Sequence, residues 1–144
     1  FFIKGGVQYA EGVGDELSSS QLPVMGAVLL ITPPTKVSTK WAYAEAIKYL
    51  PDGYSTGKFP AASGNSEEWK LFENDFEPLV FQTYPEIGTI KDRLLRLNAV
   101  FASLSGSGST VFGIFEDEAD ARKALTSFSP PLQTFLAHPI KIRN

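Results

Sequence analysis

The stretch that decides the fold is residues 99–115, which read A-V-F-A-S-L-S-G-S-G-S-T-V-F-G-I-F. Residues 100–104 and 111–115 are rich in β-branched and aromatic side chains, which predicts two strands. The loop between them consists only of small residues, Ser105, Gly106, Ser107, Gly108 and Ser109. Glycine permits positive φ, and successive N–H groups of such a loop can converge on an anion, phosphate above all. The stretch therefore predicts a strand, an anion-binding loop and a second strand.

An ordinary hairpin turn is the alternative interpretation of this loop, because Gly and Ser are also common turn residues. A flexible linker does not fit, since the loop stands between two apolar strands in the middle of a compact chain. The loop is not a Walker phosphate loop either, because the pattern G-x-x-x-x-G-K-[ST] occurs nowhere in the chain.

The composition is that of an ordinary globular domain. The chain has 144 residues, 43% of them hydrophobic and 20% charged, and it contains no apolar run long enough to span a membrane. A net charge of −3 without a clustered Lys/Arg run argues against nucleic acid or an anionic membrane surface as the partner. There is no cysteine, and the single histidine, His138, cannot supply a multi-histidine site, so no metal site is expected.

Strand and helix patterns alternate along the rest of the chain. Residues 7–10 alternate like a half-buried strand, and the apolar run 24–31 predicts a central strand buried on both faces. Capping residues and apolar spacing predict helices at 38–50, 66–72, 74–84, 85–98 and 118–128, with short strands at 133–136 and 140–142. Helices laid on one face of a mainly antiparallel sheet, with split β-α-β crossovers, give an α+β, ferredoxin-like fold. Many functions use that fold, so it does not decide the function.

Three stretches together resemble the C-terminal part of the GHMP kinase superfamily. Residues 104–115, L-S-G-S-G-S-T-V-F-G-I-F, are similar to its third motif, with Leu104 in place of the usual Met. Residues 74–77, N-D-F-E, followed by Y-P-E-I at 84–87, resemble the helix pair that precedes that motif. Residues 1–17 resemble the segment just after the catalytic aspartate in the branch that phosphorylates 4-diphosphocytidyl-2-C-methyl-D-erythritol, with Phe1 and Phe2 as the last two residues of its pattern D-V-P-F-F and Asp15 where that branch has Glu.

The resemblance implies a small-molecule kinase that transfers the γ-phosphate of ATP, with Mg²⁺, to the 2-hydroxyl of this cytidine-diphosphate substrate in non-mevalonate isoprenoid biosynthesis. It also implies a cytoplasmic protein of a bacterium or one of the plastid stroma. The family's phosphate loop, lysine and aspartate base come from an N-terminal half that is absent here, with the aspartate expected just upstream of Phe1. Residues 1–22 would then be the end of that half or its connection, and residues 23–144 the C-terminal domain. No catalytic residue is expected in this chain, and alone it should be inactive.

The resemblance also implies two substrate-binding residues. Aligning V-S-T-K-W-A-Y, residues 37–43, on the family places Thr39 and Tyr43 where a threonine and an aromatic ring contact the cytidine. Stacking on a base is chemically sensible for a tyrosine ring. The alternative is that Thr39 only caps a helix and that Tyr43 only packs in the core. The loop of Ser105 to Ser109 is expected to face the cleft between the two domains.

Two other functions compete with this interpretation. One is another kinase of the superfamily, of the homoserine or mevalonate type, against which residues 1–17 argue. The other is a non-enzymatic ferredoxin-like module that binds a small ligand, for which the loop would be an ordinary turn.

Overall fold

The computed structural model describes residues 8–12, 14–19, 26–49, 69 and 71–139. Their helices and strands, in chain order, are β1 (Gln8–Glu11), β2 (Glu16–Ser19), β3 (Ala27–Thr32), α1 (Thr39–Tyr49), α2 (Glu77–Thr83), α3 (Pro85–Arg96), β4 (Phe101–Leu104), β5 (Val111–Phe115), α4 (Glu118–Leu125) and β6 (Gln133–Ala137). The predicted strand at 140–142 and most of the predicted helix at 66–72 lie outside the described residues.

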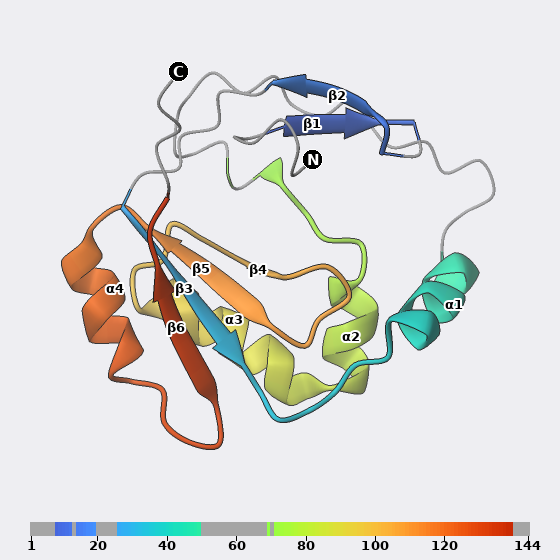
Figure 1. Cartoon of the computed structure of the whole chain (residues 1–144). Helices are drawn as coiled ribbons and strands as arrows, with labels where there is room; N and C mark the ends of the chain where they lie inside the picture. The colour runs from blue at the N-terminus through green and yellow to red at the C-terminus, as the bar shows by residue number, and fades with distance from the viewer. Residues whose placement is uncertain (1–7, 13, 20–25, 50–68, 70, 140–144) are drawn as a thin grey trace.

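The main sheet has four strands in the order β4-β5-β3-β6, and every neighbouring pair is antiparallel. The two central strands are thus β5 and β3, with Leu29 opposite both Gly113 and Leu136. Figure 1 shows α3 and α4 beside this sheet, and both helices contribute side chains to one core against it. This order is the ferredoxin-like one, and the α+β prediction is confirmed. β1 and β2 pair only with each other, as a separate antiparallel hairpin.

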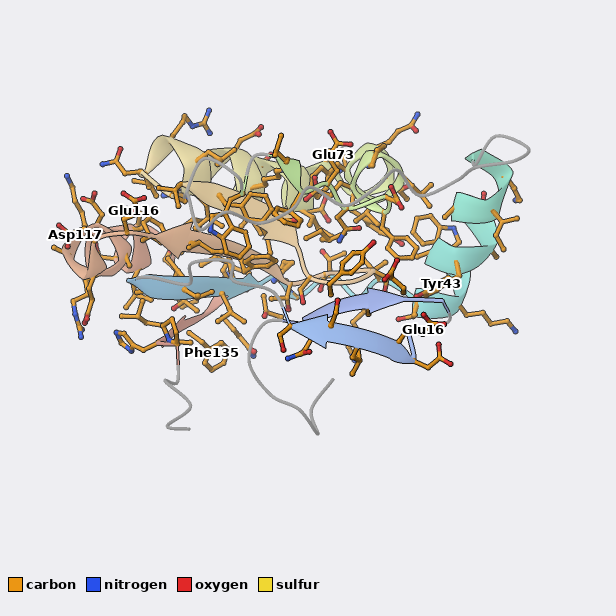
Figure 2. The ribbon with its side chains drawn as sticks, turned by 90° about the horizontal axis from the view of Figure 1, so that it is seen from above. Glu16, Tyr43, Glu73, Glu116, Asp117 and Phe135 are labelled. Carbon is orange, nitrogen blue, oxygen red and sulfur yellow. The ribbon has the colours of Figure 1, made fainter. Side chains whose placement is uncertain are left out.

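The two faces of the main sheet are covered differently. Along β3 the side chains alternate, with Ala27, Leu29 and Ile31 fully buried and the residues between them half-buried. On the second face Phe135 of β6, paired with Leu30, is 58% exposed, and Figure 2 shows it on the side of the sheet away from α2 and α3. The prediction that this strand is buried on both faces was therefore wrong, because the described helices of the core cover only one of them.

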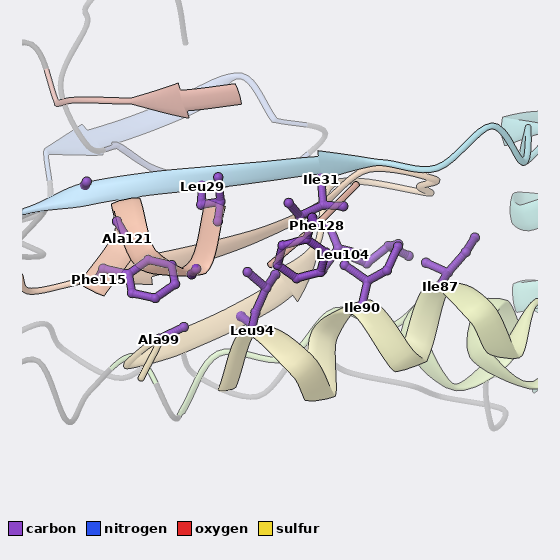
Figure 3. Close-up of a cluster of buried hydrophobic side chains, with 14 of the residues drawn as sticks. Leu29, Ile31, Ile87, Ile90, Leu94, Ala99, Leu104, Phe115, Ala121 and Phe128 are labelled. Carbon is purple, nitrogen blue, oxygen red and sulfur yellow. The ribbon is translucent and has the colours of Figure 1, made fainter. Parts of the chain in front are cut away.

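The core lies between α3 and the sheet (Figure 3). Ile87, Ile90 and Leu94 recur at helical spacing and are buried against Phe115 and Leu29 of the sheet. Each such side chain contributes about 1.5 to 3 kcal/mol when it leaves water. The predicted amphipathic helix is therefore confirmed and anchors the sheet.

The two ends of β5 carry different structures. At its carboxyl end Asp117 begins α4, since its side chain accepts a hydrogen bond of 2.8 Å from the N–H of Ala119, as helix-capping residues do. At its amino end is the loop of small residues. The cap of α4 and the loop therefore lie at opposite ends of β5. In Figure 2, Asp117 is labelled at the end of the molecule opposite Tyr43 of α1. None of the described helices has the length and apolarity that a membrane crossing needs.

Candidate functional site

The loop of Ser105 to Ser109 connects β4 to β5, so the predicted strand, loop and strand are confirmed. The N–H of Ser105 donates to the Thr110 carbonyl at 2.8 Å, and the N–H of Gly108 donates to the Ser105 carbonyl at 2.9 Å. Gly106 and Gly108 have φ of +57° and +87°, which side chains larger than hydrogen seldom adopt. The glycines therefore let the loop turn back on itself within a few residues.

Three N–H groups of this loop have no acceptor in the described part of the chain. Those of Gly106, Ser107 and Ser109 donate to none of the described residues, whereas those of Ser105 and Gly108 are paired. A Cβ built on Gly106 would meet nothing within 4 Å. The backbone at Gly106 is therefore open to close approach, and a loop of unpaired N–H groups is chemically suited to an anion.

The turn before α2 holds the other side of the loop. The Asn74 side-chain NH₂ donates to the carbonyls of Leu104 and Gly106, at 2.8 and 2.9 Å. One carboxylate oxygen of Glu77 accepts from the Ser103 hydroxyl and the Leu104 N–H, at 2.9 and 2.8 Å. The sequence pattern predicted Asn74 only as part of a helix cap. It carried no signal for these contacts, because the loop lies about 30 residues further along the chain.

Thr39 lies against the loop. Its hydroxyl forms a hydrogen bond of 3.0 Å with the hydroxyl of Ser107, which is itself buried. Capping at the start of α1 is done by Ser38, whose hydroxyl accepts from the Trp41 N–H at 3.3 Å. The helix cap was one interpretation of Thr39, and the structure assigns that role to its neighbour.

Tyr43 lies one helical turn after Thr39 and is 57% exposed. Its ring packs edge-on against Phe76, with centroids 4.9 Å apart and planes at 74°. The interpretation of Tyr43 as a core residue is therefore wrong, since its ring is available to a stacking partner from outside. Within the described part of the chain, α1 contacts the loop through Thr39 and not through Tyr43.

A hollow of about 440 Å³ opens beside Asn74 on the second face of the sheet. Aromatic side chains line much of it, namely Trp69, Phe72, Phe76, Phe101 and Phe112. Trp69 packs over Phe101 with ring centroids 5.5 Å apart. Sequence reasoning did not group these rings, because they come from four separate segments of the chain.

The described residues include no group of three or more His, Asp or Glu side chains that could hold a metal ion. His138 instead lies 3.2 Å from a carboxylate oxygen of Glu118. Arg122 donates to the same carboxylate and, with His138, keeps the pKa of Glu118 below its usual value. These groups sit at α4, away from the loop.

Residues 61–130 match the family model described as GHMP kinases C terminal. The chain carries a GHMP kinase C-terminal domain. It is 37% identical over 133 residues to the 4-diphosphocytidyl-2-C-methyl-D-erythritol kinase of Prosthecochloris aestuarii, covering 90% of this chain and 46% of the relative. It is 44% identical over 120 residues to the kinase of the same name from Bacteroides thetaiotaomicron, covering 82% of this chain and 43% of the relative. The chain thus spans about half the length of the curated relatives it matches.

Solved structures of GHMP kinases share this fold. A crystal structure of 4-(cytidine 5'-diphospho)-2C-methyl-D-erythritol kinase superposes with a TM-score of 0.61 at 22% identity, covering 90% of this chain and 48% of that one. Homoserine kinase from Cytophaga hutchinsonii gives a TM-score of 0.59 at 17% identity, covering 85% of this chain and 44% of that one. At such identities the likeness shows the GHMP kinase fold alone.

Proposed function

We propose that this GHMP kinase domain is the substrate-binding C-terminal part of an ATP-dependent kinase that phosphorylates the 2-hydroxyl of 4-diphosphocytidyl-2-C-methyl-D-erythritol, in non-mevalonate isoprenoid biosynthesis. The observation that carries the proposal is the bond between Thr39 and Ser107, which joins the start of α1 to the loop. Two segments distant in sequence, each tied to this function by resemblance, thereby form one site. The names of the relatives at 37% and 44% identity support the same substrate.

In this proposal Thr39 and Tyr43 contact the cytidine part of the substrate. The ring of Tyr43 is 57% exposed and meets Phe76 in a T-shaped contact, so part of the ring is accessible for stacking on a base. Base stacking on an aromatic side chain contributes about 1 to 3 kcal/mol in nucleic-acid complexes. The hydroxyl of Thr39 is both donor and acceptor, and it is held in place by Ser107.

The loop of Ser105 to Ser109 lies on the phosphate side of the proposed site. Three of its N–H groups have no acceptor among the residues that the structure describes, which suits a phosphate oxygen, and the open space at Gly106 suits the close approach that such binding needs. The described residues offer no cluster of acidic ligands for Mg²⁺. We therefore assign ATP and Mg²⁺ mainly to the N-terminal half of the proposed kinase, and to the loop only phosphate contacts.

The N-terminal half is the partner that this proposal requires. Phosphoryl transfer needs a positioned hydroxyl, a proton acceptor and groups that neutralise the phosphates. We place the proton acceptor just upstream of Phe1 and residues 1–22, with the β1–β2 hairpin, at the junction with that half; residues 23–144 form the C-terminal domain. The 144-residue chain alone is then expected to be inactive.

A phosphotransfer assay tests the proposal. The full-length gene product is given ATP and Mg²⁺ with 4-diphosphocytidyl-2-C-methyl-D-erythritol, homoserine or mevalonate, and the 144-residue chain is assayed in parallel. Turnover of the cytidine substrate by the full-length protein alone is the expected result. Turnover of homoserine or mevalonate instead would support a kinase of this superfamily but contradict the proposed cytidine substrate. Binding without turnover of any alcohol would favour a ligand-binding module.

Tyr43→Leu in the full-length protein is expected to raise KM for the cytidine substrate about 5- to 150-fold, the equivalent of a lost base stack of about 1 to 3 kcal/mol. KM for ATP should stay the same, because the ring stacks on the acceptor substrate only. Tyr43→Phe keeps the ring and is the matched control, with KM close to that of the wild type. Equal KM values for Tyr43→Leu and wild type would show that Tyr43 does not contact the substrate.

A further inference from the structure

We propose that Asn74 and Glu77 are positioning residues that aim the N–H groups of the loop outward, toward the phosphate that the loop binds. Neither side chain needs to touch substrate for this. The kinetic part of the inference rests on the proposed function, whereas its structural part concerns the loop alone. Each of the two side chains is hydrogen-bonded to peptide groups of the loop or of the strand end before it.

Asn74 acts on two peptide groups at once. A side-chain amide has two hydrogens, and here one goes to the Leu104 carbonyl and the other to the Gly106 carbonyl. In a trans peptide the C=O and the following N–H point in opposite directions. Pulling the Gly106 carbonyl toward Asn74 therefore turns the Ser107 N–H away from it, and that N–H has no acceptor among the described residues.

Glu77 fixes the strand end from which the loop starts. One of its oxygens accepts from the Leu104 N–H and from the Ser103 hydroxyl, and the other pairs with Lys91. The side chain is only 12% exposed, so these hydrogen bonds are shielded from water. The N–H and the C=O of Leu104 are thus held by two side chains of one turn.

That turn is itself rigid. The side-chain oxygen of Asn74 accepts from the Phe76 N–H at 2.9 Å, and its backbone carbonyl accepts from the Glu77 N–H at 2.8 Å. The two positioning residues are therefore locked to each other as well as to the loop. On the opposite side Thr39 holds Ser107. A loop held from both sides presents its N–H groups without having to reorganise when an anion binds, which is what makes such groups effective.

The test compares variants that separate loop positioning from folding. Asn74→Asp keeps the oxygen that accepts from Phe76 but replaces the NH₂ group, so a carboxylate oxygen faces two carbonyls. Glu77→Ala removes both acceptors, while Glu77→Gln keeps an acceptor for Leu104 and Ser103 and loses the negative charge that pairs with Lys91. Asp117→Ala is the control, since it removes a helix cap at the far end of β5 and touches nothing at the loop.

Amide hydrogen exchange in the full-length protein is the structural readout. The N–H groups of Leu104, Ser105 and Gly108 are paired in the structure, and we expect them to exchange at least about 10-fold faster in Asn74→Asp and Glu77→Ala. Glu77→Gln should restore protection, and Asp117→Ala should leave it unchanged. Wild-type exchange in both Asn74→Asp and Glu77→Ala would overturn the inference, whether or not the protein proves to be a kinase.

The kinetic readout follows in the same variants. Asn74→Asp and Glu77→Ala are expected to lower kcat at least about 10-fold, with KM for the cytidine substrate changed less than about 2-fold, because the loop and not Tyr43 is displaced. Glu77→Gln should recover most of kcat. A loss in Asp117→Ala as large as in Asn74→Asp would show a general effect of destabilisation and reject positioning. If the wild type phosphorylates none of the offered alcohols, the proposed function fails and the exchange experiment alone decides the inference.

Discussion

Gly26→Ala is expected to destabilise the protein by at least about 4 kcal/mol, the range reserved for severe steric or backbone strain. Gly26 stands at the start of β3 with φ of +77°. A Cβ there would lie 2.0 Å from the carbonyl oxygen of Phe115 and 2.5 Å from that of Glu116. Both obstacles are backbone atoms, so relief requires β3 and the end of β5 to separate. Because these are the two central strands, the whole sheet is affected.

Gly14→Ala is the matched control for this experiment. Gly14 also has positive φ, +90°, but a Cβ there would meet nothing within 4 Å. Gly14→Ala therefore costs only the backbone strain of a positive φ, about 1 to 2 kcal/mol. Urea unfolding of the full-length protein, followed by the fluorescence of its tryptophans, measures both variants. If Gly26→Ala and Gly14→Ala lowered the free energy of unfolding equally, the close approach of Gly26 to the Phe115 carbonyl would not explain the loss.

Gly106→Ala in the full-length kinase is expected to lower kcat/KM about 100-fold, the effect of losing one well-placed hydrogen-bond donor to a developing negative charge. The added methyl group meets no atom of the described residues within 4 Å, so folding should lose only the strain of positive φ, about 1 to 2 kcal/mol. It does, however, occupy the open space beside the unpaired N–H groups. Steady-state kinetics and urea unfolding of the same preparation measure kcat/KM and the free energy of unfolding.

Gly14→Ala again supplies the comparison, because it carries the same kind of strain far from the loop in sequence. It should lose as much stability as Gly106→Ala, so it shows how much of the effect of Gly106→Ala on stability comes from a positive φ alone. If Gly106→Ala were as active as the wild type, the loop would be an ordinary hairpin turn, the alternative that the sequence left open. If activity fell only in proportion to stability, the glycine would be structural.

The fold was largely predictable from local patterns. α3 was the clearest case, because Ile87, Ile90 and Leu94 recur at a spacing that only a helix places on one face. The loop was marked by five small residues between two apolar runs. β2 was missed, since its sequence E-L-S-S has neither β-branched nor aromatic residues and depends on pairing with β1.

The contacts of the candidate site were not predictable from the residues alone. Thr39 and Ser107 are 68 residues apart, and no local pattern indicates that their hydroxyls meet. The error at β3 has a similar origin. An apolar run shows that a strand is buried somewhere, but which face is covered depends on helices elsewhere in the chain. Residue chemistry suggested the loop of Ser105 to Ser109, and the family resemblance suggested Thr39 and Tyr43, but only the fold showed which of these residues are neighbours.

The place of β3 in the sheet also bears on how the protein is made. β3 pairs on one side with β5 and on the other with β6, whose partner residues lie about 100 residues further along the chain. Pairings between residues this distant in sequence form slowly, because the entropy cost of closing a long loop comes before any stabilising contact is made. At a synthesis rate of about 5 to 20 residues per second, β3 waits several seconds on the ribosome for its second neighbour. Until then its apolar edge is open to other chains, so nascent-chain chaperones are expected to improve the yield.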